Sequence, residues 1–298
     1  MTVFFYLDEA SVNFDDPTVL VKKEYAADLG LKERAPYILS ELCVLDMVYA
    51  VASMKDGYYL ERLVLKGGLS VRNHVDLLNH RFSFDVDFDA NTQGGYTFGK
   101  VDMIRRDLIE YGNRRGCRIS VKEARDTARD YFLELGYRKP IEDMGGRLVE
   151  VPMLELCKSC RVFQEPRKGA MNTFIDLDLL GLKPPEVYHV GLEEQFATKL
   201  FIIGASGRQR NQFDAYDAMR IAESNPRLGW RVAKTIFEEK VRRHKAKLGP
   251  YVQECRHQLD AMLKNPGKRS KLQDTVFRSD FGFDRMVESV KSMYDFKG

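Results

Sequence analysis

The segment from residue 63 to residue 89 constrains the fold of this chain more than any other part of the sequence. An apolar run at 63–65 predicts a buried strand, and Gly67-Gly68 follows it almost at once. A short helix is expected next, and residues 81–89 then alternate between apolar and polar with a period of two, which is typical of a strand with one buried face. The order and closeness of these features favour a functional site over unrelated turns and surface strands.

The acidic face of the second predicted strand carries Asp85, Asp87 and Asp89. Neighbours two apart on a strand lie roughly 6.5 Å apart at Cα, so three carboxylates there repel each other. A divalent cation turns that repulsion into a binding site, because Mg²⁺ is held by one or two carboxylates together with substrate phosphates. A solvated sheet face is the simpler interpretation of the same pattern.

The glycine pair Gly67-Gly68 supplies a second part of the predicted site. Glycines between a strand and a helix let the backbone approach a phosphate group and direct N–H groups at it. Taken alone, such a pair is equally well a plain turn.

The whole segment resembles the signature of one family of enzymes. This family is AbiEii, the abortive-infection and MenT-like toxin nucleotidyltransferases of the polymerase-β superfamily, and the resemblance covers most of residues 60–220. The matching residues are Lys66-Gly67-Gly68-Leu69-Ser70 and Arg81-Phe82-Ser83-Phe84-Asp85-Val86-Asp87-Phe88. The resemblance implies that the glycine turn holds the triphosphate of a nucleotide and that Asp85 and Asp87 hold Mg²⁺. It also implies nucleotide contacts from Lys66, Gly67, Gly68, Ser70, Arg81 and Ser83.

A second acidic pair, Asp176 and Asp178, lies in an alternating segment that predicts a strand over Thr173–Leu180. Nucleotidyl transfer uses a third carboxylate beside the attacking hydroxyl, as a base or a metal ligand. The family carries an Asp shortly before a proline-containing loop, here Pro184-Pro185, so we expect Asp176 in this role, with Asp178 as the alternative. The pattern also fits a plain surface strand.

Two predicted helices, from Leu192 and over Gln212–Ser224, carry a further resemblance. The segments Ala197-Thr198-Lys199-Leu200 and Arg208 to Asp217 are similar to the AbiEii patterns A-x-K-L and R-x-x-R-D-x-x-D-L. Asn211-Gln212-Phe213 separates Arg210 from Asp214, and Ala218 replaces the usual Leu, which are departures from the family. The resemblance implies that Lys199, with Arg208 or Arg210, contacts the triphosphate, and that Asp214 or Asp217 orients Lys199 or touches the nucleotide. An ordinary surface pair of Asp217 with Arg220 is the alternative.

Composition sets broad limits on location and class. The chain has 298 residues, 44% hydrophobic and 31% charged, as in globular proteins. No apolar run approaches the ~18 residues needed to cross a bilayer, and the N-terminus has no basic region before its apolar stretch, so we expect a cytoplasmic protein. Cys157 and Cys160 form a C-x-x-C without a second pair, which favours ordinary thiols over zinc.

The expected architecture is α+β. A polymerase-β-like nucleotidyltransferase core, a mixed sheet flanked by helices, occupies residues 1–190, and a helical region at 191–298 completes the active cleft. The basic residues concentrate after residue 224, where the net charge is +8 against −5 for residues 1–224. Such a charge excess fits a solvated helix face or contact with RNA phosphates.

The function that these features predict is transfer of a nucleoside monophosphate from an NTP to an acceptor hydroxyl, with Mg²⁺ as cofactor. Because MenT-like relatives modify the 3′ end of tRNA, the resemblance implies a toxin that blocks translation and a cognate antitoxin encoded nearby. A protein or small-molecule hydroxyl is the alternative acceptor. A non-catalytic nucleotide-binding protein is the alternative from another class.

Overall fold

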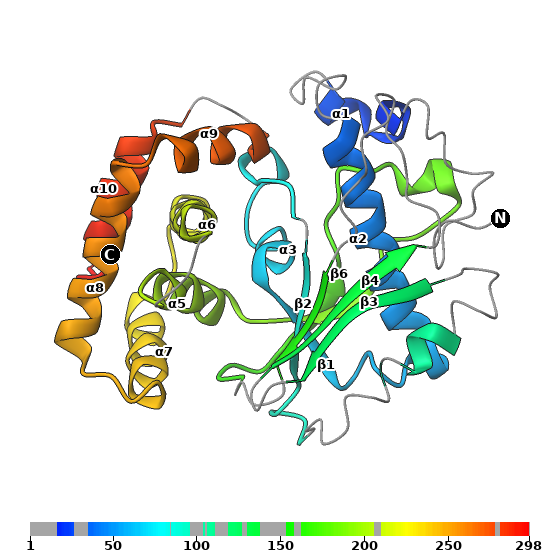
Figure 1. Ribbon diagram of the computed structural model, residues 1–298, viewed down its shortest axis with the longest axis horizontal. Coiled ribbons are helices and arrows are strands. Elements are labelled where there is room, and N and C mark those ends of the chain that lie inside the picture. Colours follow the sequence, from blue (N-terminus) through cyan, green and yellow to red (C-terminus); the bar gives the residue numbers. More distant parts are fainter. Residues whose placement is uncertain are drawn as a thin grey trace. The chain divides into compact units, whose positions relative to one another are not determined.

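The structure, a computed structural model, describes residues 17–26, 35–83, 85–95, 104, 106–110, 119–126, 130–137, 153–157, 162–205, 210–277 and 281–297 (Figure 1). The chain divides into two compact units. The first comprises Met1–Leu69 and Phe82–Val190, and the second comprises Ser70–Arg81 and Gly191–Gly298. A search of the described residues for a helix with the length and apolar character of a membrane span finds none.

A mixed sheet forms the first unit, and its strand order in the described part of the chain is β3-β4-β5-β2-β1-β7-β6. The central strand β1 pairs antiparallel with β2 and parallel with β7, and β2 pairs parallel with β5. The strand predicted at 63–65 is therefore confirmed, and the one predicted over 81–89 forms from Asp85 onward. The structure makes the two strands neighbours at the centre of the sheet. The bounds are β1 Leu63–Lys66, β2 Asp85–Ala90, β3 Ile119–Asp126, β4 Asp130–Tyr137, β5 Met153–Cys157, β6 Arg167–Ala170 and β7 Glu186–His189.

Helix α2, Ala35–Ser53, is the main helix of the first unit. It agrees with the apolar residues at helical spacing over 37–54, which contain neither Gly nor Pro and predict a core helix there. Every residue from Ile38 to Val51 is buried, as expected for a helix that is mostly apolar on all sides. It contacts β2 and runs beside the sheet in Figure 1. The short helices are η2 Pro17–Leu20, α1 Lys23–Ala26, η4 Met54–Gly57, α3 Gly67–Val71, η5 Leu77–Asn79 and η6 Leu177–Leu180.

Six helices dominate the second unit, which confirms the predicted helical C-terminal region. They are α5 Leu192–Ile203, α6 Asn211–Ser224, α7 Trp230–Arg243, α8 Leu248–Leu263, α9 Pro266–Thr275 and α10 Phe283–Met293. Helix α6 packs against α5, α9 and α10, and its first nine residues are all buried. The sequence from Trp230 to Leu248 predicts one helix, but α7 ends at Arg243, because Lys245 adopts a left-handed backbone conformation with φ of 57°.

The strand predicted over Thr173–Leu180 is wrong. Ile175 makes only an isolated bridge with Val21, and η6 then occupies Leu177–Leu180. Phe174 and Ile175 are both fully buried although they are consecutive, whereas Leu179 is 62% exposed. The buried apolar side chains of Phe174 and Ile175 therefore belong to a tight turn, not to one face of a sheet.

Three predictions fall wholly or partly outside the described residues. Apolar residues at helical spacing predict a helix over 98–115, of which the structure describes Ile104 and 106–110, as helix. Cys160 and Arg208 lie outside the described part of the chain, so the assignment of Cys157 and Cys160 as ordinary thiols stays a prediction.

Candidate active site

An acidic face of the sheet forms around β2, as its alternating sequence predicts. Val86 and Phe88 are buried, while Asp85 and Asp87 are half-buried on the opposite face. Asp89 shares that face but is only 7% exposed. The strand therefore offers two accessible carboxylates rather than three.

Glu155 on β5 is the acidic neighbour of this pair that sequence reasoning missed. The parallel register of β2 and β5 places Glu155 directly beside Asp87. Leu154 and Leu156 on either side of it are buried, whereas Glu155 is half-buried. The alternation of leucine and glutamate in 153–157 indicates a strand with Glu155 on its polar face. Only the pairing of β2 with β5 shows that this face is the one that carries Asp85 and Asp87.

Lys66 provides the positive charge within this acidic face. Its Nζ lies 2.8 Å from Oδ1 of Asp89 and 3.9 Å from Oε1 of Glu155. Burial alone would lower the pKa of Lys66, but the carboxylates of Asp89, Glu155 and Asp87 outweigh it and raise the pKa above its ordinary value. Lys66 therefore stays charged and holds two carboxylates in place, and a direct nucleotide contact from it stays a prediction.

Gly67 brings the backbone against one of the carboxylates. It has a positive φ of 70°, and a Cβ at this position would lie 1.9 Å from Oδ2 of Asp87. Only glycine accepts both the backbone conformation and the close approach. The turn and the acidic strand therefore form one structural feature, as their order in the sequence indicates.

Replacing Gly67 with alanine tests this close approach. We expect the left-handed conformation to cost about 1–2 kcal/mol of stability, and the collision with Oδ2 of Asp87 to displace that carboxylate. Transfer activity should therefore fall more than stability explains. Urea unfolding and turnover, measured on the same preparation, check this, with Gly95→Ala as control because Gly95 also has a positive φ but no atom near the added Cβ. Equal activity in the two alanine variants would contradict the prediction.

Two serines beside these elements carry hydroxyls that a ligand can use. Ser70 in α3 and Ser83 just before β2 are 0% and 3% exposed, and neither hydroxyl has a hydrogen-bond partner among the described residues. Buried hydroxyls are normally hydrogen-bonded. Both hydroxyls are therefore donors without a described acceptor, and a nucleotide contact from either of them stays a prediction.

The donor set of the acidic face fits Mg²⁺. In the described part of the chain, no group of three His, Cys, Asp or Glu side chains is arranged to hold a metal by itself. Mg²⁺ requires less than this from the protein, because water and substrate phosphates complete its six ligands. Asp85 and Asp87, half-buried and two apart on β2, are the residues that would hold it.

A buried charge network lies in the second unit and centres on Asp217. Asp217 is fully buried, and its Oδ2 lies 2.7 Å from Nζ of Lys199. Lys199 also donates to Oδ1 of Asp214 over 3.1 Å. Arg81 donates two hydrogen bonds to Asp217, from Nε to Oδ1 at 3.0 Å and from Nη2 to Oδ2 at 2.9 Å.

This network fixes Lys199 in place. Lys199 is only 3% exposed and lies between two carboxylates on one face of α6. Burial would raise the pKa of Asp217, but Arg81 first and Lys199 second lower it far below its ordinary value. Asp217 is therefore ionised and orients Lys199. The alternative pairing of Asp217 with Arg220 is wrong, since Arg220 pairs with Glu223 at 3.0 Å.

Comparison with known proteins identifies the family. The family model described as "Nucleotidyl transferase AbiEii toxin, Type IV TA system" matches residues 51–291. The chain belongs to this family. The AbiEii assignment confirms the resemblance predicted from the sequence, and it makes the protein a nucleotidyltransferase toxin of a toxin–antitoxin system.

The fold of this AbiEii chain is also similar to a solved structure. The match is MenT4, a nucleotidyltransferase toxin from Mycobacterium tuberculosis H37Rv, with a TM-score of 0.61 and 19% identity, covering 92% of this chain and 88% of that chain. At that identity the likeness shows the fold alone, and it confirms the predicted α+β nucleotidyltransferase fold. A search of curated proteins finds no match to the sequence.

The remaining predicted AbiEii residues do not belong to the strands described above. Asp176 is half-buried beside the bridge of Ile175, and its backbone N–H donates to the carbonyl of Leu20. Asp178 is exposed in η6, and Arg210 is exposed at the start of α6. The roles of Asp176, Asp178 and Arg210 stay predictions, as does that of Arg208.

Proposed function

We propose that this protein transfers a nucleoside monophosphate from an NTP to the 3′-terminal hydroxyl of tRNA, in a Mg²⁺-dependent reaction that blocks translation. The pair of half-buried carboxylates, Asp85 and Asp87, with Gly67 against the second of them, carries the proposal. Phosphoryl chemistry asks the protein mainly for positioning and charge stabilisation. A glycine turn beside two accessible carboxylates suits both needs.

The proposed step is an in-line displacement at the α-phosphorus. The acceptor oxygen forms a bond to this phosphorus, the bond from it to the oxygen bridging to the β-phosphate breaks, and pyrophosphate leaves. A bound Mg²⁺ ion supplies positive charge to the phosphate oxygens. The proposal includes the nucleotide contacts that the family resemblance implies for Ser70, Ser83 and Lys199. Within its own unit Lys199 is held by Asp214 and Asp217.

The proton of the acceptor hydroxyl needs a carboxylate to receive it. Glu155 is the best supported candidate, because it is the register neighbour of Asp87 on β5. The ammonium of Lys66 lies 3.9 Å from its Oε1 and places a positive charge beside this carboxylate. Asp176 remains the alternative proposal, although it does not lie on any of the strands described.

Replacing Glu155 with glutamine distinguishes these two carboxylates. We expect the transfer rate to fall about 10²–10⁴-fold, the usual contribution of a positioned base, with NTP affinity nearly unchanged. Asp176→Asn should leave the rate within about threefold of the native value if Glu155 is the base. Single-turnover rates and equilibrium NTP binding separate the two effects. A large loss in Asp176→Asn with a fully active Glu155→Gln would reverse the assignment.

The experiment that tests the function incubates the purified protein with total tRNA, Mg²⁺ and each of the four labelled NTPs in turn. We expect label at the tRNA 3′ end, none after Asp85→Ala, and none when EDTA removes the metal. Label on a protein or small molecule, with none on tRNA, would reject the proposed acceptor and keep the transferase. If metal did not strengthen NTP binding at all, the proposal that the protein acts as an enzyme would be rejected.

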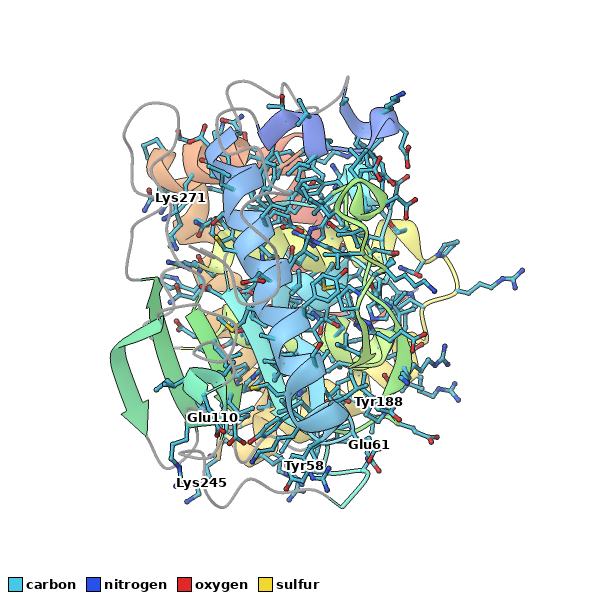
Figure 2. The ribbon with its side chains drawn as sticks, turned by 90° about the vertical axis from the view of Figure 1, so that its right-hand side faces the viewer. Tyr58, Glu61, Glu110, Tyr188, Lys245 and Lys271 are labelled. Carbon is cyan, nitrogen blue, oxygen red and sulfur yellow. The ribbon has the colours of Figure 1, made fainter. Side chains whose placement is uncertain are left out.

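A basic surface supports RNA as the acceptor. Four basic residues are exposed at the end of α7 and in the connection to α8, and Lys245 is labelled in Figure 2. They are Arg242, Arg243, Lys245 and Lys247. Arg242 and Arg243 share Glu239, so the surface keeps a net positive charge. Neutralising these four residues should remove toxicity and keep NTP hydrolysis if RNA is the acceptor. Unchanged toxicity would favour a smaller acceptor.

A cognate antitoxin, as the family implies, is the expected protein partner.

A further inference from the structure

The start of helix α6 and the start of helix α9 lie together in the second unit. Lys268, in the first turn of α9, donates its Nζ to Oδ1 of Asn211, the first residue of α6. Helix α6 has 14 residues, and Arg210 at its N-cap makes no side-chain capping bond. The acidic residue in the first turn of this helix is Asp214, and its carboxylate already accepts a hydrogen bond from Lys199.

Lys268 differs from most of the half-buried or buried lysines of the described chain. Lys66, Lys199, Lys240 and Lys291 each lie within 4 Å of a carboxylate, whereas the half-buried Lys22, like Lys268, has none that close in the part of the chain that the structure describes. Lys268 is half-buried, yet its ammonium has no carboxylate within that distance among the described residues, and its contact is a neutral amide. Burial lowers the pKa of Lys268, which records the cost of desolvating this cation. An anion from outside the chain would offset that cost.

Asn211 supplies an independent observation. Its side chain is 1% exposed, and because its Oδ1 accepts from Lys268, its Nδ2 is left as the donor end of the amide. That Nδ2 has no hydrogen-bond partner in the described part of the protein. A buried donor without an acceptor costs about 1–3 kcal/mol, so such groups are rare unless a ligand satisfies them.

We propose that the Lys268 ammonium and the Asn211 amide, at the N-terminus of α6, form a phosphate-binding subsite. A phosphate group matches the site because its oxygens accept from both donors and its charge balances Lys268. The phosphate belongs either to the triphosphate of the NTP or to the backbone of an acceptor RNA. The subsite does not rest on the proposed transfer reaction, because binding alone reveals it.

Binding to two probes locates the source of the phosphate. Wild-type protein and Lys268→Gln are titrated with a fluorescent RNA carrying a single-stranded CCA end, over a range of salt, and separately with ATP without metal. Lys268→Gln should lower the affinity for one of the two probes about tenfold, because one charge-assisted hydrogen bond is lost. If RNA is the source, the salt slope should also decrease by about one.

Lys271→Gln is the matched control. Lys271 lies one turn along α9, is exposed, and is labelled in Figure 2. Its replacement should change either affinity by less than twofold. Unchanged affinity of Lys268→Gln for both probes, or an equal loss in Lys271→Gln, overturns the proposal.

Chemical labelling tests the same subsite without a mutation. Wild-type protein is acetylated briefly with and without ATP or the RNA, and the modified fractions of Lys268 and Lys271 are compared by mass spectrometry. One of the two ligands should protect Lys268 several-fold and leave Lys271 unchanged. Labelling of Lys268 that neither ligand alters overturns the proposal even if a variant proves unstable.

Discussion

Replacing Asp85 or Asp87 with asparagine is expected to lower nucleotidyl transfer at least about a thousandfold, since a metal at a phosphoryl site supplies several kcal/mol of charge stabilisation. The stability of the folded protein should not decrease. Both side chains are half-buried on a face that also holds Asp89 and Glu155, with Lys66 as the described cation among them. Removing one negative charge reduces repulsion, so the melting temperature should stay equal or rise.

Transfer to tRNA, growth after induced expression, and thermal unfolding check this pair of effects together. Glu61→Gln is the matched control, because Glu61 is an exposed carboxylate just before β1 in the same unit and is labelled in Figure 2. It should retain activity and toxicity. A soluble Asp85→Asn protein with full toxicity would remove Asp85 from the site, and loss of activity with equal loss of stability would make its role structural.

The acidic site shows what local sequence patterns can predict. The period of two in 85–89 and the glycine pair at 67–68 correctly predicted a strand beside a tight turn, because both signals are local. Glu155 was missed because a parallel partner strand has no local signal for its register. The same alternation at 173–180 predicted a strand that does not form, since a bridge followed by a 3-10 turn satisfies it equally well.

The helical unit shows a similar limit. The one-turn spacing of Asp214 and Asp217 correctly placed both on one face, and Lys199 meets them there. Arg81 could not be predicted as the second partner of Asp217, because it is 136 residues away in the sequence. Helix α9 could have been found, because Asn265 caps it and Pro266 opens it, which is a known start signal.

Replacing Asp217 with asparagine is expected to lower the free energy of unfolding by about 3–5 kcal/mol, because removing one partner leaves buried charges uncompensated. Lys199 and Arg81 both lose a carboxylate, and both are nearly fully buried. Urea unfolding at neutral pH measures the change. Glu223→Gln on the same helix is the control, since Glu223 is 48% exposed and its pair with Arg220 is worth at most about 1 kcal/mol.

Acid should remove the difference between Asp217→Asn and the native protein. Arg81 and Lys199 hold the pKa of Asp217 below the unfolded value of about 3.9, so its ionised form stabilises the fold fully above that pH. As the pH falls below about 4, the native protein loses this contribution, whereas the asparagine variant has none to lose. The gap between the two unfolding free energies should therefore begin to narrow near pH 4 and keep narrowing as the pH falls towards the depressed native pKa of Asp217. A gap that stays constant or widens would show that Asp217 contributes through packing rather than charge, and Lys199 would then be positioned by Asp214 alone.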